Sequence, residues 1–97
     1  MNIQKLMRQA QQMQEQMRRD LATAEFSASV GGGMVEVRMN GEKEVLAVQI
    51  DPEVLDPEDP AMVQDLVQAA VNEAGRKVNE FVGQRIGNMA GGIPGLT

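Results

Sequence analysis

The sequence has no cysteine, histidine, tryptophan or tyrosine, and its aromatic residues are Phe26 and Phe81 alone. Without cysteine, disulfides and thiolate metal sites are excluded. Without histidine, the commonest general base and the commonest zinc ligand are missing. No motif of nucleophilic catalysis surrounds the few serine and threonine residues. We therefore expect a protein that is not an enzyme and that uses no metal, cofactor or small-molecule substrate.

Long apolar runs are missing as well. No segment approaches the roughly 20 apolar residues of a membrane span, and residues 1–20 carry basic residues but not the uninterrupted apolar stretch of a signal peptide. The sequence therefore predicts a cytoplasmic protein with no membrane segment. Its 97 residues suit one domain, which we place at residues 1–90, followed by a flexible Gly/Pro tail at 91–97.

The net charge of −5 is unevenly distributed along the chain. Residues 1–19 contain four basic residues and one acid, residues 20–60 contain ten acids and two basic residues, and residues 61–97 are balanced. Such a chain presents positive charge at one end while it stays acidic as a whole. The acidic segment 51–59 lacks the ligand spacing and the glycine of a calcium loop, so we interpret it as the turn before a helix.

Apolar residues spaced three and four apart predict two long helices. The first covers residues 2–24, and its apolar stripe contains Ile3, Leu6, Met7, Ala10, Met13, Met17, Leu21 and Ala24. The second begins at Asp59-Pro60, a capping residue followed by proline at the first helical position. We expect it to reach the mid-80s, where Gly83 and Gly87 favour fraying.

Between the predicted helices the apolar period changes to two. Residues 26–30 and 35–39 alternate apolar with polar side chains, and residues 45–50 form a third apolar segment. The glycines at 31–33 and the pair Asn40-Gly41, which tolerates positive φ, mark the turns. The sequence therefore predicts an α+β fold of order α-β-β-β-α, in which two long helices flank a three-stranded antiparallel sheet.

The predicted helices are longer than the sheet. A helix over residues 2–24 is about 35 Å long, whereas a strand over residues 45–50 spans about 20 Å. Each helix therefore overhangs the sheet with part of its apolar stripe exposed, and a homodimer is the simplest way to cover that stripe. The residues predicted for the dimer interface are Met13, Met17, Leu21, Val35, Val37, Val78 and Phe81.

The first helix also has a basic face, opposite its apolar stripe. Two interpretations remain open: contact with the phosphates of a nucleic acid, or a solvated helix face, which composition alone favours. Arg85 is in line with the apolar stripe of the second helix, and we expect it beyond the core, near Lys5 and Arg8. The residues that would contact phosphates in the first interpretation are Lys5, Arg8, Gln12, Arg18, Arg19 and Arg85.

Four segments together resemble the bacterial nucleoid-associated YbaB/EbfC family. They are residues 7–17 (MRQAQQMQEQM), 33–41 (GMVEV followed by NG), 48–52 (VQIDP) and 65–74 (DLVQAAVNEA). Each segment is plain by itself, but together they cover nearly the whole chain in the order of the family.

The resemblance implies a tweezer-like homodimer that binds duplex DNA through phosphate contacts with low sequence specificity. It implies a location at the nucleoid, a part in nucleoid organisation and gene regulation, and recombination or replication proteins as further partners. An alternative stays open: a protein–protein adaptor for such a recombination or replication factor. In that case the Met-rich stripe and the acidic middle segment dock the partner, and DNA binding is incidental.

Overall fold

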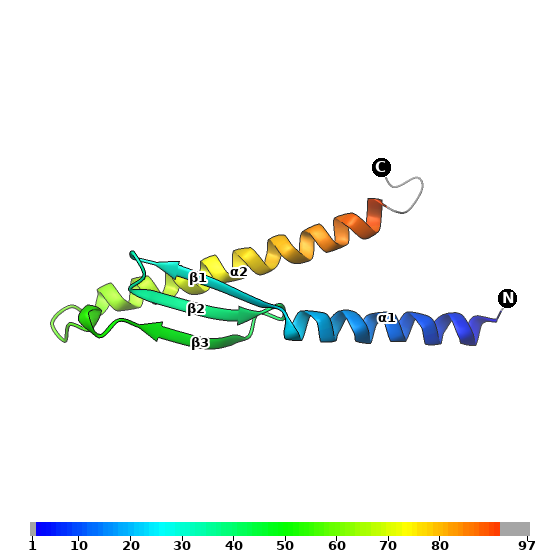
Figure 1. Cartoon of the computed structure of the whole chain (residues 1–97), viewed down its shortest axis with the longest axis horizontal. Helices are drawn as coiled ribbons and strands as arrows, with labels where there is room; N and C mark the ends of the chain where they lie inside the picture. The colour runs from blue at the N-terminus through cyan, green and yellow to red at the C-terminus, as the bar shows by residue number, and fades with distance from the viewer. Residues whose placement is uncertain (1, 92–97) are drawn as a thin grey trace.

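The computed structural model describes residues 2–91, and its elements follow the predicted order α-β-β-β-α (Figure 1). A single 3-10 turn at Pro52–Val54 precedes the second helix. The predicted tail at 91–97 lies outside the described residues except for its first residue. The main elements are α1 (Ile3–Thr23), β1 (Glu25–Val30), β2 (Val35–Asn40), β3 (Val45–Ile50) and α2 (Pro60–Gly91).

The second helix is longer than predicted. The expectation that it ends in the mid-80s is wrong, because α2 passes through Gly83 and Gly87 and continues to Gly91. Each glycine costs a helix only about 1 kcal/mol relative to alanine, and no proline follows before Pro94. Isolated glycines therefore weaken this helix without ending it.

The three strands form an antiparallel meander in the order β1-β2-β3, as predicted. Ala28 of β1 and Val48 of β3 both lie opposite Val37 of the central strand, so the three side chains share one face. A shift of register between Arg38 and Met39 marks a bulge in the pairing of β2 with β3.

Both predicted turns are present, but the second has a different physical basis. The three glycines of the first turn all have positive φ, between 63° and 93°. In the second turn the residue with positive φ is Lys43 (65°), not Asn40 or Gly41. A Cβ on Gly41 would lie 2.6 Å from the carbonyl oxygen of Leu21. Gly41 is therefore needed for a close approach between the β2–β3 turn and the end of α1.

The core lies between one face of the sheet and α2. Alanines at two successive turns of α2 allow the helix to come close to the strands, and the rings of Phe26 and Phe81 meet edge to face at one end, with centroids 5.2 Å apart. α2 lies over β1 and β2 and leaves β3 to one side (Figure 1). The buried residues of this core are Ala28, Val35, Val37, Met39, Ala70, Ala74 and Val78.

The first helix is an arm rather than a layer of the core. Within Ile3–Thr23 no residue is buried. α1 continues outward from the end of the sheet where β1 begins, and it projects to the same side as the free end of α2 (Figure 1). The radius of gyration is 19.1 Å, whereas a compact domain of this length has about 12–13 Å. The predicted overhang of both helices is confirmed.

Candidate nucleic-acid interface

The predicted basic face lies on the free arm. All its members on α1 are exposed, and among the described residues none of its four cations is in an ion pair. From the first cation to the last, the face extends about 21 Å along the helix axis. These exposed residues are Lys5, Arg8, Gln12, Arg18 and Arg19.

The tip of the arm concentrates positive charge. Asn2 caps the helix, since its side-chain oxygen accepts a hydrogen bond from the backbone N–H of Lys5 at 3.3 Å. The first turn contains no acidic residue to offset the partial positive charge of a helix N-terminus. Lys5 and Arg8 add two full charges there. This arrangement is unfavourable for the free helix and favourable toward an anion.

Closer to the sheet, the basic face is mixed. Glu15 lies beside Arg18 and Arg19, and the three side chains line a shallow hollow of about 200 Å³. Because the carboxylate of Glu15 lowers the local positive potential, the tip is the more attractive part of the arm for a polyanion.

Arg85 does not join these cations, so the expectation that it lies near Lys5 and Arg8 is wrong. Its Nη2 donates to Oδ2 of Asp20 at 2.8 Å, and its guanidinium lies over the ring of Phe81, 5.8 Å from the centroid. Asp20 is about 22 Å along the helix from Lys5. Arg85 therefore contacts the root of the arm and not its tip.

Two contacts hold the root of the arm. The first is the ion pair of Asp20 with Arg85, to which Gln16 adds a hydrogen bond at 2.9 Å. The hydrogen bond from Gln16, and then that from Arg85, hold the pKa of the Asp20 carboxyl below its usual value. The second is the backbone N–H of Gly41, which donates to the carbonyl oxygen of Leu21 at 2.7 Å. Together these contacts set the direction in which α1 projects.

The sequence analysis did not identify Asp20 and Gly41, the two residues that hold the root of the arm. A signal was present for Asp20, because it borders the apolar stripe of α1 and Arg85 is in line with the stripe of α2. Two opposite charges on facing apolar stripes indicate an ion pair between the helices. No local signal identified the role of Gly41, since its neighbour Leu21 is distant in sequence.

The residues predicted for a dimer interface separate into three groups. Val35, Val37 and Val78 are buried within the protomer, so their own sheet and helix already cover them and they offer no surface to a second copy. Met13 is 65% exposed and lines, with Met17, a hollow of about 300 Å³ between the arm and Arg85. The other two predicted residues, Leu21 and Phe81, are half-buried.

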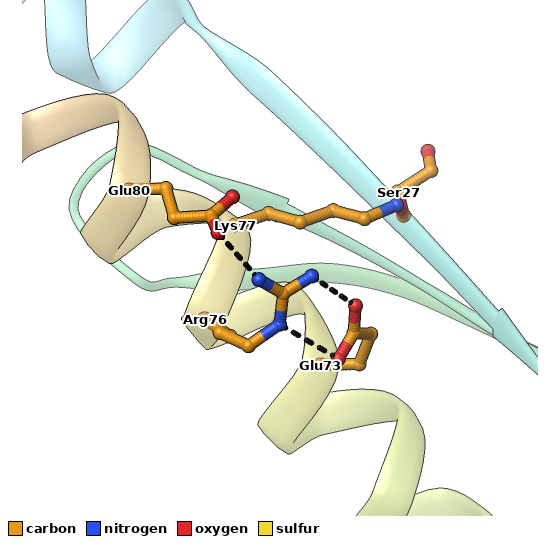
Figure 2. A network of polar contacts seen from close by, with 5 residues as sticks. All are labelled: Ser27, Glu73, Arg76, Lys77 and Glu80. Atoms are coloured by element: carbon orange, nitrogen blue, oxygen red, sulfur yellow. Dashed lines mark hydrogen bonds and ion pairs between the residues drawn. The ribbon is translucent and has the colours of Figure 1, made fainter. Parts of the chain in front are cut away.

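The cations of α2 differ from those of the arm because they are engaged within the protomer (Figure 2). Arg76 contacts the carboxylate of Glu73 with two nitrogens, at 2.6 and 3.0 Å, and also contacts Glu80. The hydrogen bonds from Arg76 hold the pKa of Glu73 below its usual value, and Glu73 in turn raises the pKa of Arg76. The Nζ of Lys77 donates to the carbonyl oxygen of Ser27 in β1. The two long helices therefore differ, because among the described residues α1 has four cations outside any ion pair, whereas Arg76, Lys77 and Arg85 of α2 each contact a group of the protomer.

Residues 2–91 contain neither a membrane-spanning helix nor a cluster of metal ligands. No described helix is long and apolar enough to cross a membrane. No three acidic, histidine or cysteine side chains of the described part gather as ligands of a metal ion.

This chain is similar to known proteins over almost its whole length. Residues 1–93 match the model of the YbaB/EbfC DNA-binding family. Nucleoid-associated proteins of Alkaliphilus metalliredigens and Clostridium botulinum are 47% and 50% identical, over 98% and 97% of this chain and 88% and 86% of those proteins. The crystal structure of an uncharacterized protein from Helicobacter pylori, HP0035, is similar with a TM-score of 0.78 and 27% identity. The match covers 92% of this chain and 97% of the Helicobacter pylori chain, so the likeness includes the arm as well as the sheet.

Proposed function

This chain belongs to the YbaB/EbfC DNA-binding family, and we propose that it binds duplex DNA as a homodimer through the cations of α1. The contacts are with backbone phosphates, and sequence specificity is low. In this proposal the protein works at the nucleoid in the cytoplasm and contributes to nucleoid organisation and gene regulation, in keeping with the names of its relatives.

One observation carries the proposal: α1 contributes nothing to the core and keeps its cations unpaired. No residue of Ile3–Thr23 is buried, and the arm nevertheless holds Lys5, Arg8, Arg18 and Arg19 outside any ion pair of the described residues. A helix that does not stabilise the fold and points positive charge outward suits contact with a polyanion.

The chemistry of the arm favours phosphates over bases. Contacts to phosphate oxygens position a protein on the duplex without reading its sequence. The two aromatic rings, Phe26 and Phe81, contact one another in the body of the protein, so α1 has no ring on which an unpaired base could stack. The acidic body repels DNA, which confines binding to the arm and makes it weak and sensitive to salt.

The homodimer is supported by the number of cations and by the apolar stripe. One arm offers few phosphate contacts, and a second copy doubles them. The stripe of α1 that the protomer leaves uncovered includes Ile3, Leu6, Met7 and Met13, each at least 49% exposed, and exposed apolar surface of this kind marks an interaction site.

The test compares two variants that remove the same charge. Lys5→Gln with Arg8→Gln alters the tip of the arm, whereas Arg38→Gln with Lys43→Gln alters exposed cations of the body. At low salt we expect the tip variant to bind a random duplex about ten-fold more weakly, with a salt dependence shallower by about one unit for each phosphate that is no longer neutralised. The body variant should bind like the wild type. Equal affinities for the two variants would argue against the assignment to α1.

The exposed stripe of α1 also supports the adaptor as a second candidate. A Met-rich apolar helix face adapts to different partner surfaces, and a recombination or replication protein is the kind of partner expected. If the wild type shows no measurable duplex binding near physiological salt, the adaptor becomes the better account. The tip variant would then bind its protein partner unchanged.

A further inference from the structure

Asn40 and Gly41 are the one Asn-Gly pair of the sequence, and they lie at the end of the sheet from which α1 projects (Figure 1). We propose that Asn40 is a site of deamidation, a self-modification that the root of the arm prevents while it is closed and permits when it opens. The proposal depends neither on DNA binding nor on a second copy of the chain.

The reaction needs only the chain and water. The backbone nitrogen of Gly41 attacks Cγ of Asn40, the new N–C bond closes a succinimide ring, and Nδ2 leaves as ammonia with the proton that the attacking nitrogen gives up. Water then adds to either carbonyl of the ring, which opens to aspartate or to isoaspartate. Asparagine is among the thermally labile residues, and a following glycine favours the reaction because no Cβ shields its nitrogen or restricts its backbone.

In the folded chain the attacking nitrogen is occupied. The N–H of Gly41 donates to the carbonyl oxygen of Leu21 at 2.7 Å, and Gly41 is itself buried. Loss of the proton would leave a negatively charged nitrogen facing a carbonyl oxygen, away from water, at a high cost in free energy. The nitrogen therefore becomes a nucleophile only after its hydrogen bond to the arm has opened.

The carboxamide under attack is held from another side, by the β2–β3 turn. Oδ1 of Asn40 accepts the backbone N–H groups of Glu42 and Glu44 at 2.9 and 3.0 Å, and Nδ2 donates to Oε1 of Glu44 at 3.1 Å. Glu42, Lys43 and Glu44 are all exposed, and an exposed turn opens readily by itself. The contact with α1 is thus the second barrier to the reaction.

The fold requires both residues of this reactive pair. A Cβ at Gly41 would lie 2.6 Å from the carbonyl oxygen of Leu21, so the joint needs glycine there. At Asn40, which is 4% exposed, the side chain must both accept and donate, and aspartate would place a carboxylate against that of Glu44. The joint that directs the arm is therefore built from a dipeptide that is chemically stable only while the joint is closed.

Few contacts keep the joint closed. No residue of Ile3–Thr23 is buried, and the ion pair that supports the root joins two partly exposed side chains, Arg85 (39%) and Asp20 (35%). Contacts of this kind open locally, without unfolding of the core. The N–H of Gly41 is thus released more often than the amides in the middle of β2.

The modification makes a temporary opening permanent. Aspartate at position 40 can still accept the two N–H groups of the turn, but it loses the donor to Glu44. Isoaspartate lengthens the backbone at the end of β2, where Asn40 lies opposite Glu25 of β1, and so moves Gly41 relative to Leu21. Either product weakens the joint, and isoaspartate weakens it more.

Peptide mass spectrometry of the full chain, incubated in warm and mildly alkaline buffer, tests the proposal. Two variants make the same change of charge on α1. Asp20→Arg puts a positive charge opposite Arg85 and loosens the root, whereas Glu15→Arg changes an exposed residue that is outside any ion pair of the described residues. Circular dichroism verifies that both are folded.

The folded wild type should deamidate at Asn40 about 100-fold more slowly than the same chain unfolded in urea. Asp20→Arg should react about five-fold faster than the folded wild type, the factor expected when one partly exposed ion pair is lost. Glu15→Arg should react like the wild type. Equal rates for the two variants, or a folded wild type that reacts as fast as the unfolded chain, would overturn the proposal.

Hydrogen exchange of the wild type gives an independent answer, even if Asp20→Arg does not fold. The N–H of Ala24 donates to Asp20 at the end of α1, whereas Val37 lies in the central strand and is buried. We expect the amide of Gly41 to be protected to the same degree as that of Ala24, and about ten-fold less than that of Val37. A Gly41 amide protected as strongly as that of Val37 would mean that the joint opens only with the sheet, which contradicts control by the arm.

Discussion

The two long helices have similar apolar spacing but opposite relations to the sheet. α2 buries Ala70, Ala74 and Val78 against the strands, whereas no residue of Ile3–Thr23 is buried. The sheet itself explains the difference. Its face toward α2 is apolar, while its other face carries residues such as Glu36 and Arg38 on the central strand. One apolar face accommodates one helix, so the other helix must project.

The largest loss of stability should come from a charge placed on the buried face of α2. Val78→Asp puts a carboxylate without a partner at a position that is 1% exposed, which costs at least about 3 kcal/mol. A small domain has only about 5–15 kcal/mol of stability in total. We therefore expect urea denaturation followed by circular dichroism to show a protein that is largely unfolded or close to it.

The same change on the arm is the matched control. Met13→Asp introduces the same charge at an apolar position of α1, but the side chain is 65% exposed. Measured below the concentration at which two copies associate, its free energy of unfolding should stay within about 0.5 kcal/mol of that of the wild type. If both variants lost similar stability, α1 would be part of a core, and the contrast between the two helices would be wrong.

Much of this contrast was within reach of the sequence. The change from a period of about 3.6 to a period of two identified the helices and strands, and the lengths of residues 2–24 and 45–50 predicted the overhang. The alternation of Val35 and Val37 with Glu36 and Arg38 also contained the reason for the arm, since it describes a sheet with one apolar face.

The remaining details depend on contacts that periodicity does not encode. An apolar residue at helical or strand spacing has the same pattern whether its own chain or a second copy covers it, so Val37 and Val78 were expected at an interface although they belong to the core. The position of Arg85 depends on the angle between the two helices. The contacts that set this angle, Asp20 with Arg85 and Gly41 with Leu21, join residues that are far apart in sequence.

The joint between arm and sheet should show the next largest effect. Gly41→Ala places a Cβ 2.6 Å from the carbonyl oxygen of Leu21, which is a backbone atom and has little freedom to move. We expect a loss of about 1–3 kcal/mol in the free energy of unfolding, typical of an overpacked site. Gly75→Ala is the control, because a Cβ there meets no atom within 4 Å.

The control should change stability in the opposite direction. Gly75 lies inside α2, where alanine is preferred over glycine by about 0.5–1 kcal/mol, so Gly75→Ala should stabilise the protein. Urea denaturation of both variants shows whether each change raises or lowers the free energy of unfolding. If Gly41→Ala were as stable as the wild type, the contact with Leu21 would not hold the root of the arm.

A smaller and more local effect is expected at the tip. Asn2→Ala removes the cap that accepts the N–H of Lys5, a change that costs a helix about 0.5–2 kcal/mol. Because α1 opens without disturbing the core, hydrogen exchange of the amides near Arg8 should become faster while the urea midpoint stays unchanged. Slower exchange in α1 than in the buried turn around Ala74, in either protein, would contradict an arm that opens independently.

The smallest expected effect tests the ion pair at the root through its dependence on pH. Hydrogen bonds from Gln16 and Arg85 lower the pKa of Asp20 from its ordinary value of 3.8. A carboxyl whose pKa is lower in the folded state stabilises the protein at pH values above its unfolded pKa, and this contribution is lost as the pH falls through the folded value. The difference in melting temperature between wild type and Asp20→Asn should thus be greatest near neutral pH and shrink below about pH 4.

Glu58→Gln, which removes the same charge from a carboxylate outside any ion pair of the described residues, is the control and should keep the pH dependence of the wild type. The side chains of Asp20 and Arg85 are both partly exposed, so the pH-dependent difference in melting temperature is small and shrinks further in high salt. Its sign is nevertheless decisive for the joint. A difference between wild type and Asp20→Asn that grew in acid would mean that protonated Asp20, and not its ion pair with Arg85, holds the arm against α2.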